Sequence, residues 1–163
     1  MHQNNVFLSI GTNIGDKLLN LKNALVSLNT NHTLVELKSN YYKSEPLYLK
    51  NQPNFINMVV KVQTSLKLKD FFIFIKNIES EMGRKFNKKK NGPRIIDIDI
   101  LTYNNLIHNS EQLTVPHKKI NERLFVLLPW SEIAADYILP NLKIKIKSLL
   151  NTTKDDSKVI KLN

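Results

Sequence analysis

One short stretch, Gly92–Leu101, constrains the fold of this chain most, because it plants two acids in an otherwise apolar run. Asp97 and Asp99 alternate there with isoleucines. Side chains alternate between the two faces of a strand, so the pattern predicts a strand with both carboxylates on one face and the isoleucines on the other. The sequence therefore predicts a sheet with an apolar face and a small acidic patch opposite.

Two neighbouring carboxylates at the edge of an apolar core need compensating cations, because burial and mutual repulsion both oppose their ionisation. Their hard oxygen atoms suit Mg²⁺, which keeps several waters and is commonly completed by substrate phosphates. Four cations, Lys88, Lys89, Lys90 and Arg94, precede the acids, as a metal-bound polyphosphate requires. The alternative is an amphipathic strand whose acids simply face solvent.

Length and composition bound the class of protein. The 163 residues, 42% of them hydrophobic, fit one domain over residues 1–163. The absence of cysteine excludes disulfides, cysteine-based zinc sites and thiol nucleophiles. The apolar run at 6–10 is too short for a signal peptide or membrane span, so we expect a cytoplasmic protein without a membrane partner. The formal net charge of +10 favours an anionic partner, although lysine and asparagine are abundant throughout.

Apolar spacing predicts alternating strands and helices. The expected extended segments are 6–10, 33–48, 55–62 and 98–103, and the expected helices are 16–28 and 68–82, the second ended by Gly83. This order predicts an α+β ferredoxin-like sandwich, a mostly antiparallel sheet with helices on its faces. Further along, we expect a tight hairpin at 104–105, a buried helix or turn at 124–130, an edge element at 142–150 and a candidate last strand at 159–160.

Several residues carry both a functional and a structural interpretation. Asn57 interrupts an apolar strand, where its amide either satisfies backbone groups or faces a planar polar ligand. Glu79 falls on the more polar side of its helix and is expected to be solvated. The basic loop 84–91 is either a lid over phosphates or a solvated loop. His117 either contacts a phosphate or a metal-bound water, or lies at a polar surface.

The glycines at the end of the first strand have a weaker signal. Gly11 and Gly15 fit a tight turn better than a phosphate cradle, because the Lys-Ser/Thr pair of a P-loop is missing.

Three motifs together resemble a known family. The pattern GPRxxDxD at 92–99, the LTVPH run at 113–117 and Arg123-x-Phe125 closely resemble the 6-hydroxymethyl-7,8-dihydropterin pyrophosphokinases of folate synthesis. The resemblance extends from about Val6 to Pro140. It implies transfer of the β,γ-pyrophosphoryl group of ATP to the pterin hydroxymethyl oxygen, release of AMP, and two Mg²⁺ ions.

The resemblance also implies roles for individual residues. The catalytic set is Asp97, Asp99, Arg94 and Lys90, with the two aspartates as metal ligands. The ATP-binding set is Glu79, Arg84, Ile100, Thr114, His117, Lys118 and Arg123. The pterin-binding set is Ser44, Glu45, Leu47, Phe55, Asn57 and Phe125, in which two aromatic rings sandwich a flat heterocycle.

Four positions depart from the pattern of the best-known members. Asn91 precedes Gly92 where those members carry an aromatic residue, and Lys90 replaces an arginine. Phe86 and Gln112 stand where an arginine often binds phosphate. We expect the reaction class to be retained, with altered lid closure and nucleotide affinity.

Two alternatives to this enzyme belong to other classes. A basic ferredoxin-like RNA-binding module has the same element order, but no strand carries the basic-aromatic RNA-binding pattern and the acid pair would repel phosphates. A catalytically inactive homologue that acts as an interaction partner is the second. For the enzyme we expect a monomer with small-molecule substrates and no nucleic-acid partner.

Overall fold

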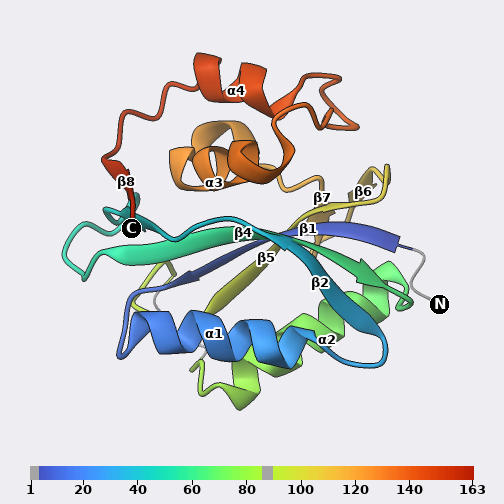
Figure 1. Cartoon of the computed structure of the whole chain (residues 1–163), viewed down its shortest axis with the longest axis horizontal. Helices are drawn as coiled ribbons and strands as arrows, with labels where there is room; N and C mark the ends of the chain where they lie inside the picture. The colour runs from blue at the N-terminus through green and yellow to red at the C-terminus, as the bar shows by residue number, and fades with distance from the viewer. Residues whose placement is uncertain (1–3, 86–89) are drawn as a thin grey trace.

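The structure, a computed structural model, describes residues 4–85 and 90–163 and is built on an antiparallel sheet (Figure 1). The six-stranded sheet has the order β5-β1-β4-β3-β8, and β2 pairs with β4 beside β3. Its strands are β1 (Asn4–Thr12), β2 (Thr33–Lys38), β3 (Tyr42–Ser44), β4 (Phe55–Thr64), β5 (Asp97–Tyr103) and β8 (Val159–Lys161). Every pairing among them is antiparallel, as predicted.

Helices cover both faces of the sheet (Figure 1). The helices are α1 (Lys17–Leu28), α2 (Leu68–Glu81), α3 (Leu124–Ala134) and α4 (Ile146–Thr152). Leu21 of α1 and Phe71 of α2 pack against one face in the first apolar layer. Trp130 of α3 and Leu149 of α4 belong to a second layer with Phe7 of β1 on the other face. The predicted α+β sandwich with helices on its faces is confirmed.

The strand order follows from the ferredoxin-like succession β1-α1-β2-β4-α2-β5, which places β1 and β4 in the centre and β5 at an edge. Asp16 caps α1 by accepting a hydrogen bond from the Leu19 N–H at 3.0 Å. Gly83, with φ of 89°, lies just beyond the end of α2 as predicted. Local residue chemistry thus sets the helix ends, and the apolar alternation of the strands sets the layers.

The prediction of a tight turn at the two early glycines is right for one and wrong for the other. Gly15 has φ of 71°, a conformation that glycine adopts without strain. Gly11 instead continues β1, where it pairs with Asn57 of β4.

The prediction of a hairpin at 104–105 is right about the turn but wrong about the strands that pair. A turn is formed there, but β6 (His108–Asn109) pairs with β7 (Thr114–Val115) instead of β5. The Ser110 N–H donates to the Leu113 carbonyl at 2.9 Å, which turns the chain back onto itself away from β5.

The predicted edge element at 142–150 is also wrong, because its second half is the helix α4. Ile146 and Leu149 are buried in the second apolar layer, while Lys145 and Lys147 point outward. The alternation of lysine with apolar residues fits a strand, but apolar residues three apart fit a helix, and packing against α3 decides between them.

The two remaining C-terminal predictions are confirmed. The predicted helix or turn at 124–130 is α3, reached through the 3-10 turn η1 (Ile120–Glu122), and the candidate last strand is β8. No helix within residues 4–85 and 90–163 is long and apolar enough to cross a membrane.

Glu132 fastens α3 to the sheet edge. One carboxylate oxygen accepts from the Asn40 backbone N–H at 2.9 Å and from its side-chain amide at 2.6 Å, and the other accepts from Tyr42 and pairs with Lys161 at 3.4 Å. Burial opposes ionisation, but the hydrogen bonds from Tyr42 and Asn40 outweigh it and lower the pKa of Glu132. The ionised carboxylate thereby ties the helix to β3 and β8.

We predict that Glu132→Gln destabilises the protein only at pH values at which the Glu132 carboxyl group of the wild type is ionised. A carboxyl group whose pKa is lowered by folding contributes stability above its unfolded pKa of about 4.3 and loses it as the pH falls through the folded value. Urea unfolding at pH 7 should show a loss of about 1 kcal/mol. The difference from the wild type should shrink as the pH falls below about 4.3; a loss independent of pH would contradict the assignment.

Candidate active site

Three adjoining hollows meet at the start of β5. The first, called the aromatic hollow, is lined by Asp97 and Asp99 together with all six residues predicted for the pterin: Ser44, Glu45, Leu47, Phe55, Asn57 and Phe125. The second, the basic hollow, is lined by both aspartates and Arg84, Lys90, Arg94, His117 and Arg123. The third, the side hollow, is lined by Asp99, Ile100, Thr114, His117 and Lys118. Asp99 lines all three.

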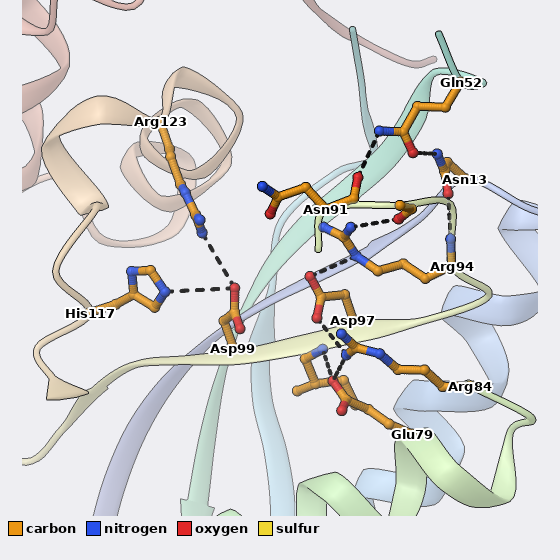
Figure 2. Close-up of polar contacts among 12 residues, drawn as sticks. Asn13, Gln52, Glu79, Arg84, Asn91, Arg94, Asp97, Asp99, His117 and Arg123 are labelled. Carbon is orange, nitrogen blue, oxygen red and sulfur yellow. Dashed lines mark hydrogen bonds and ion pairs between the residues drawn. The ribbon is translucent and has the colours of Figure 1, made fainter. Parts of the chain in front are cut away.

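The acids are bound by arginines (Figure 2). Asp97 accepts from Arg84 at 2.6 Å through one oxygen and from Arg94 at 2.9 Å through the other. Asp99 is held less closely, with Arg123 at 3.4 Å and the His117 imidazole at 3.9 Å. The compensating cations that the sequence demanded are thus present as side chains.

Charge balance keeps Asp97 ionised. Burial would raise its pKa, but the fields of Arg94 and Arg84 outweigh burial, so the pKa of the Asp97 carboxyl lies below its ordinary value. The isoleucines on either side face the opposite layer and are buried, as the alternation predicted. The strand therefore presents the acid pair, with Asp97 ionised, on one face while its other face stabilises the core.

Glu79 of α2 supports the pairing of Arg84 with Asp97. The prediction that it is solvated is wrong, because the side chain has no exposed surface. One carboxylate oxygen accepts from the Ile98 N–H and from Arg84, both at 2.6 Å, and the other pairs with Lys76 at 3.0 Å. Burial raises the pKa of Glu79 against the opposing fields of Lys76 and Arg84. Glu79 thus holds Arg84 against Asp97 and fixes the first residues of β5.

A sequence signal for this burial existed. Phe71, Ile75 and Ile78 form the apolar stripe of α2, and Glu79 lies four residues beyond Ile75 on the same stripe. An acid on a buried stripe indicates a partnered charge.

His117 stands between the basic and side hollows. Its Nδ1 accepts from the Lys119 N–H at 3.1 Å, which leaves the ring proton of the neutral form on Nε2, facing Asp99. Burial lowers the pKa of His117, and Asp99 only partly offsets that effect. A neutral imidazole that can donate through Nε2 is therefore the favoured form.

The aromatic hollow has a polar floor. The buried Asn57 amide donates to the Ser44 hydroxyl at 2.8 Å. The Arg94 guanidinium lies 4.9 Å from the centre of the Phe55 ring, and Arg123 lies 5.6 Å from that of Phe125. Gly11 faces Asn57 so closely that a Cβ atom there would lie 2.7 Å from Oδ1. The hollow can hold a flat ring between apolar walls and hydrogen bond its edge.

The acid pair fits a magnesium site that ligands complete. Within residues 4–85 and 90–163, no group of three or more histidine, aspartate or glutamate side chains is placed to hold a metal. Two hard carboxylates beside a basic hollow nonetheless match Mg²⁺, which binds one or two carboxylates together with waters and substrate phosphates. Asp97 and Asp99 are the residues that would hold it.

The altered positions are only partly described. Phe86 lies outside the described residues, as does the middle of the predicted lid. Asn91, with φ of 62°, lines the aromatic hollow, Lys90 is exposed at the basic hollow, and Gln112 lines the side hollow. Sequence reasoning missed Tyr48, which lines the aromatic hollow.

We predict that Glu79→Ala costs about 3–5 kcal/mol of unfolding free energy, because it removes the buried carboxylate that compensates the partly buried Arg84 and Lys76 and leaves the Ile98 N–H without its acceptor. Glu79→Gln should cost less, since the amide oxygen still accepts from Ile98. Denaturant unfolding with Glu81→Ala, an exposed acid on the same helix, provides the control. Equal effects of Glu79→Ala and Glu81→Ala would refute the supporting role.

Comparison with known proteins agrees with this geometry. The family model described as 7,8-dihydro-6-hydroxymethylpterin-pyrophosphokinase (HPPK) matches residues 7–135. A 2-amino-4-hydroxy-6-hydroxymethyldihydropteridine pyrophosphokinase of Haemophilus influenzae is 37% identical over 158 residues, covering 96% of this chain and 97% of the relative.

Other relatives are longer. The folic acid synthesis protein FOL1 of Dictyostelium discoideum is 45% identical over 141 residues, which cover 86% of this chain but 21% of that protein. A crystal structure of Plasmodium falciparum HPPK-DHPS has a TM-score of 0.77 and 18% identity, covering 93% of this chain and 46% of the other. The chain thus spans about a fifth of the first of these and under half of the second. From the family match and the full-length bacterial similarity, the chain belongs to the 7,8-dihydro-6-hydroxymethylpterin-pyrophosphokinase family.

Proposed function

We propose that this protein transfers the β,γ-pyrophosphoryl group of ATP to the hydroxymethyl oxygen of 6-hydroxymethyl-7,8-dihydropterin, releasing AMP, as a step of tetrahydrofolate synthesis. One observation carries the proposal: Asp97 and Asp99 line both the aromatic hollow and the basic hollow. A flat acceptor in one hollow and a polyphosphate in the other would meet at the acid pair. Family membership supports the same reaction.

The aromatic hollow suits the pterin. It combines apolar and aromatic walls with a few convergent polar groups, as small-molecule sites do. Phe55 and Phe125 would flank the bicyclic ring, and Asn57 would read its hydrogen-bonding edge. A site that pairs its buried polar groups with the ligand rejects analogues that lack those groups.

The basic hollow suits the donor. Arg94, Arg84, Lys90 and Arg123 would hold the triphosphate, while the neutral His117 would donate from Nε2 to a phosphate oxygen. The acceptor hydroxyl loses its proton as its oxygen bonds to the β-phosphorus, and the bond from that phosphorus to the AMP oxygen breaks. We propose that Asp97 and Asp99 would hold two Mg²⁺ ions, which would supply charge neutralisation of the phosphates. Positioning by the protein accounts for much of the acceleration.

The side hollow would receive the nucleoside. Ile100, Thr114 and Lys118 line it next to His117, so a triphosphate in the basic hollow leads directly to it. Glu79 would act on the nucleotide through Arg84, because its own side chain has no exposed surface.

The RNA-binding alternative lacks support in the fold. An RNA-recognition module stacks bases on an open sheet face, whereas here helices pack on both faces (Figure 1). We further propose that residues 1–163 form one domain acting in the cytoplasm as a monomer on small molecules.

We predict pterin-dependent AMP release from ATP and Mg²⁺ by the purified protein. Asp97→Asn and Asp99→Asn should each reduce it at least about 100-fold, because each removes a carboxylate that would hold Mg²⁺ at the reacting phosphates. Chromatographic detection of AMP with and without pterin, and after EDTA followed by Mg²⁺, checks this. Circular dichroism should show both variants folded. AMP release that ignores pterin, or an active double variant, would overturn the assignment.

We also predict that Gly11→Ala raises the KM for the pterin about 10-fold or more, because its Cβ displaces the Asn57 amide and costs a buried hydrogen bond. Isothermal titration should find the affinity for a non-hydrolysable ATP analogue within about twofold of the wild type. Gly15→Ala is the matched control: it has room for a Cβ but strains a positive φ, so it should lower stability without changing the pterin KM. An unchanged KM in Gly11→Ala would contradict the role of Asn57.

A further inference from the structure

Two amide side chains outside the predicted site join three separate segments next to it (Figure 2). Gln52 belongs to the loop between β3 and β4, which carries Glu45, Leu47 and Tyr48 of the aromatic hollow. Its amide nitrogen donates to the Leu49 carbonyl at 2.8 Å and to the Asn91 carbonyl at 2.9 Å. Gln52 thus connects this loop to the segment that leads into β5.

Asn13 completes the connection from the end of β1. Its amide nitrogen donates to Gln52 Oε1 and to the Pro53 carbonyl, both at 3.0 Å. Its amide oxygen accepts from the Arg94 N–H at 2.9 Å, and its own N–H donates to the Arg94 carbonyl at 3.1 Å. Asn13 is 1% exposed, so these bonds are shielded from water.

The network ends at a residue that reaches both hollows. Asn13 is hydrogen-bonded to both backbone groups of Arg94: it accepts from the Arg94 N–H and donates to the Arg94 carbonyl. The Arg94 guanidinium then donates to Asp97 and to the Gly92 carbonyl at 2.9 Å each, and it lies over the Phe55 ring. A displacement of this backbone would therefore move a cation shared by the aromatic and basic hollows.

We propose that Gln52 and Asn13 are positioning residues for pyrophosphoryl transfer. They hold the loop between β3 and β4 against residues 91–94, and so place Arg94 at the boundary between the aromatic hollow and the basic hollow. This inference rests on the proposed function. Asn13 lines none of the three hollows and acts through Arg94, whereas Gln52 also lines the aromatic hollow and reaches Arg94 through Asn13 and Asn91. Reacting groups must meet within a fraction of an ångström, and a misplacement of about 1 Å costs on the order of 100-fold in rate.

Isosteric acids test the network with little change in shape. Asn13→Asp keeps an oxygen for the Arg94 N–H but turns a second oxygen toward Gln52 Oε1 and the Pro53 carbonyl. Gln52→Glu keeps the acceptor for Asn13 but replaces the donor that binds the Leu49 and Asn91 carbonyls. In each variant a carboxylate oxygen faces acceptor oxygens to which an amide N–H donated before. The resulting repulsion should loosen residues 91–94.

Asn20→Asp is the matched control. Asn20 is also a buried amide, 8% exposed, and it donates to the Thr12 hydroxyl at 3.2 Å and to the Ile14 carbonyl at 2.9 Å. It lies beside the same turn, yet none of these bonds reaches Gln52 or Arg94. Its replacement should lower the melting temperature as Asn13→Asp does, while leaving the reaction intact.

The decisive readout is kcat per folded molecule, with the affinity for a non-hydrolysable ATP analogue measured in parallel. We expect kcat to fall about 10–100-fold in Asn13→Asp and Gln52→Glu, with nucleotide affinity within about threefold, because only the alignment is lost. Asn20→Asp should keep kcat within about twofold. Wild-type kcat in both network variants, or an equal loss in Asn20→Asp, would overturn the proposal. If Asn13→Asp does not fold, the exchange of the Arg94 Nε–H in Gln52→Glu decides, because Gln52 also lines the aromatic hollow and a change in kcat alone does not separate positioning from contact with the acceptor.

A second readout separates this inference from the proposed function. In nitrogen-15 NMR spectra the Arg94 Nε–H, which donates to Asp97, should exchange slowly with solvent in the wild type and in Asn20→Asp, and quickly in both network variants. This result is independent of turnover. An inactive wild type with the expected NMR pattern would refute the proposed reaction and leave the placement of Arg94 by the network established; unchanged exchange in the network variants would refute that placement.

Discussion

The site depends on keeping Asp97 ionised in a place that water reaches poorly. Burial alone would raise its pKa, and two arginines reverse that effect. These arginines must in turn be compensated, and the structure does so by alternating signs: Lys76 and Arg84 flank Glu79, while Arg84 and Arg94 flank Asp97. Removing one member leaves a partly buried charge without its partner, which costs far more than an exposed ion pair would gain.

The fold places this series of alternating charges, which runs from Lys76 through Glu79, Arg84 and Asp97 to Arg94 and is called the charge series, where ligands can reach it. β5 is an edge strand of the sheet and pairs with β1 along one edge alone. The side hollow opens along its other edge, at Ile98 and Ile100. Ile98 anchors the strand in the first apolar layer while its N–H is bound by Glu79 of α2. The same residue thus fixes the strand to the core and to the charge series. A central strand, paired on both sides, could not present the acid pair beside such a hollow.

Features that arise from neighbouring residues could be predicted from the sequence. The alternation around Asp97 predicted both faces of β5, and the stripe of α2 predicted its packing. Features set by distant partners could not: Gln52 meets Asn91, and Asn13 meets Arg94, only after three segments have come together. The helix α4 was mistaken for an edge element because lysines alternate with apolar residues up to Lys147, as in a strand. The helical spacing of Ile146 and Leu149 becomes decisive only when α3 provides the packing surface. Glu79 was misjudged because its polarity outweighed its position on the apolar stripe.

Under the proposed function, the arginines on Asp97 have two successive tasks. Both carboxylate oxygens of Asp97 accept from guanidinium groups, so a metal ion held by Asp97 would have to share this carboxylate with Arg84 and Arg94 or displace them. A polyphosphate bound together with the metal would offer new acceptors to any arginine that the metal displaced. Metal alone would add positive charge beside two arginines, whereas the phosphate would bring the compensating negative charge. Donor binding at this site should therefore require both together, and the hold of Asn13 on the Arg94 backbone lets that side chain exchange partners without displacing the strand.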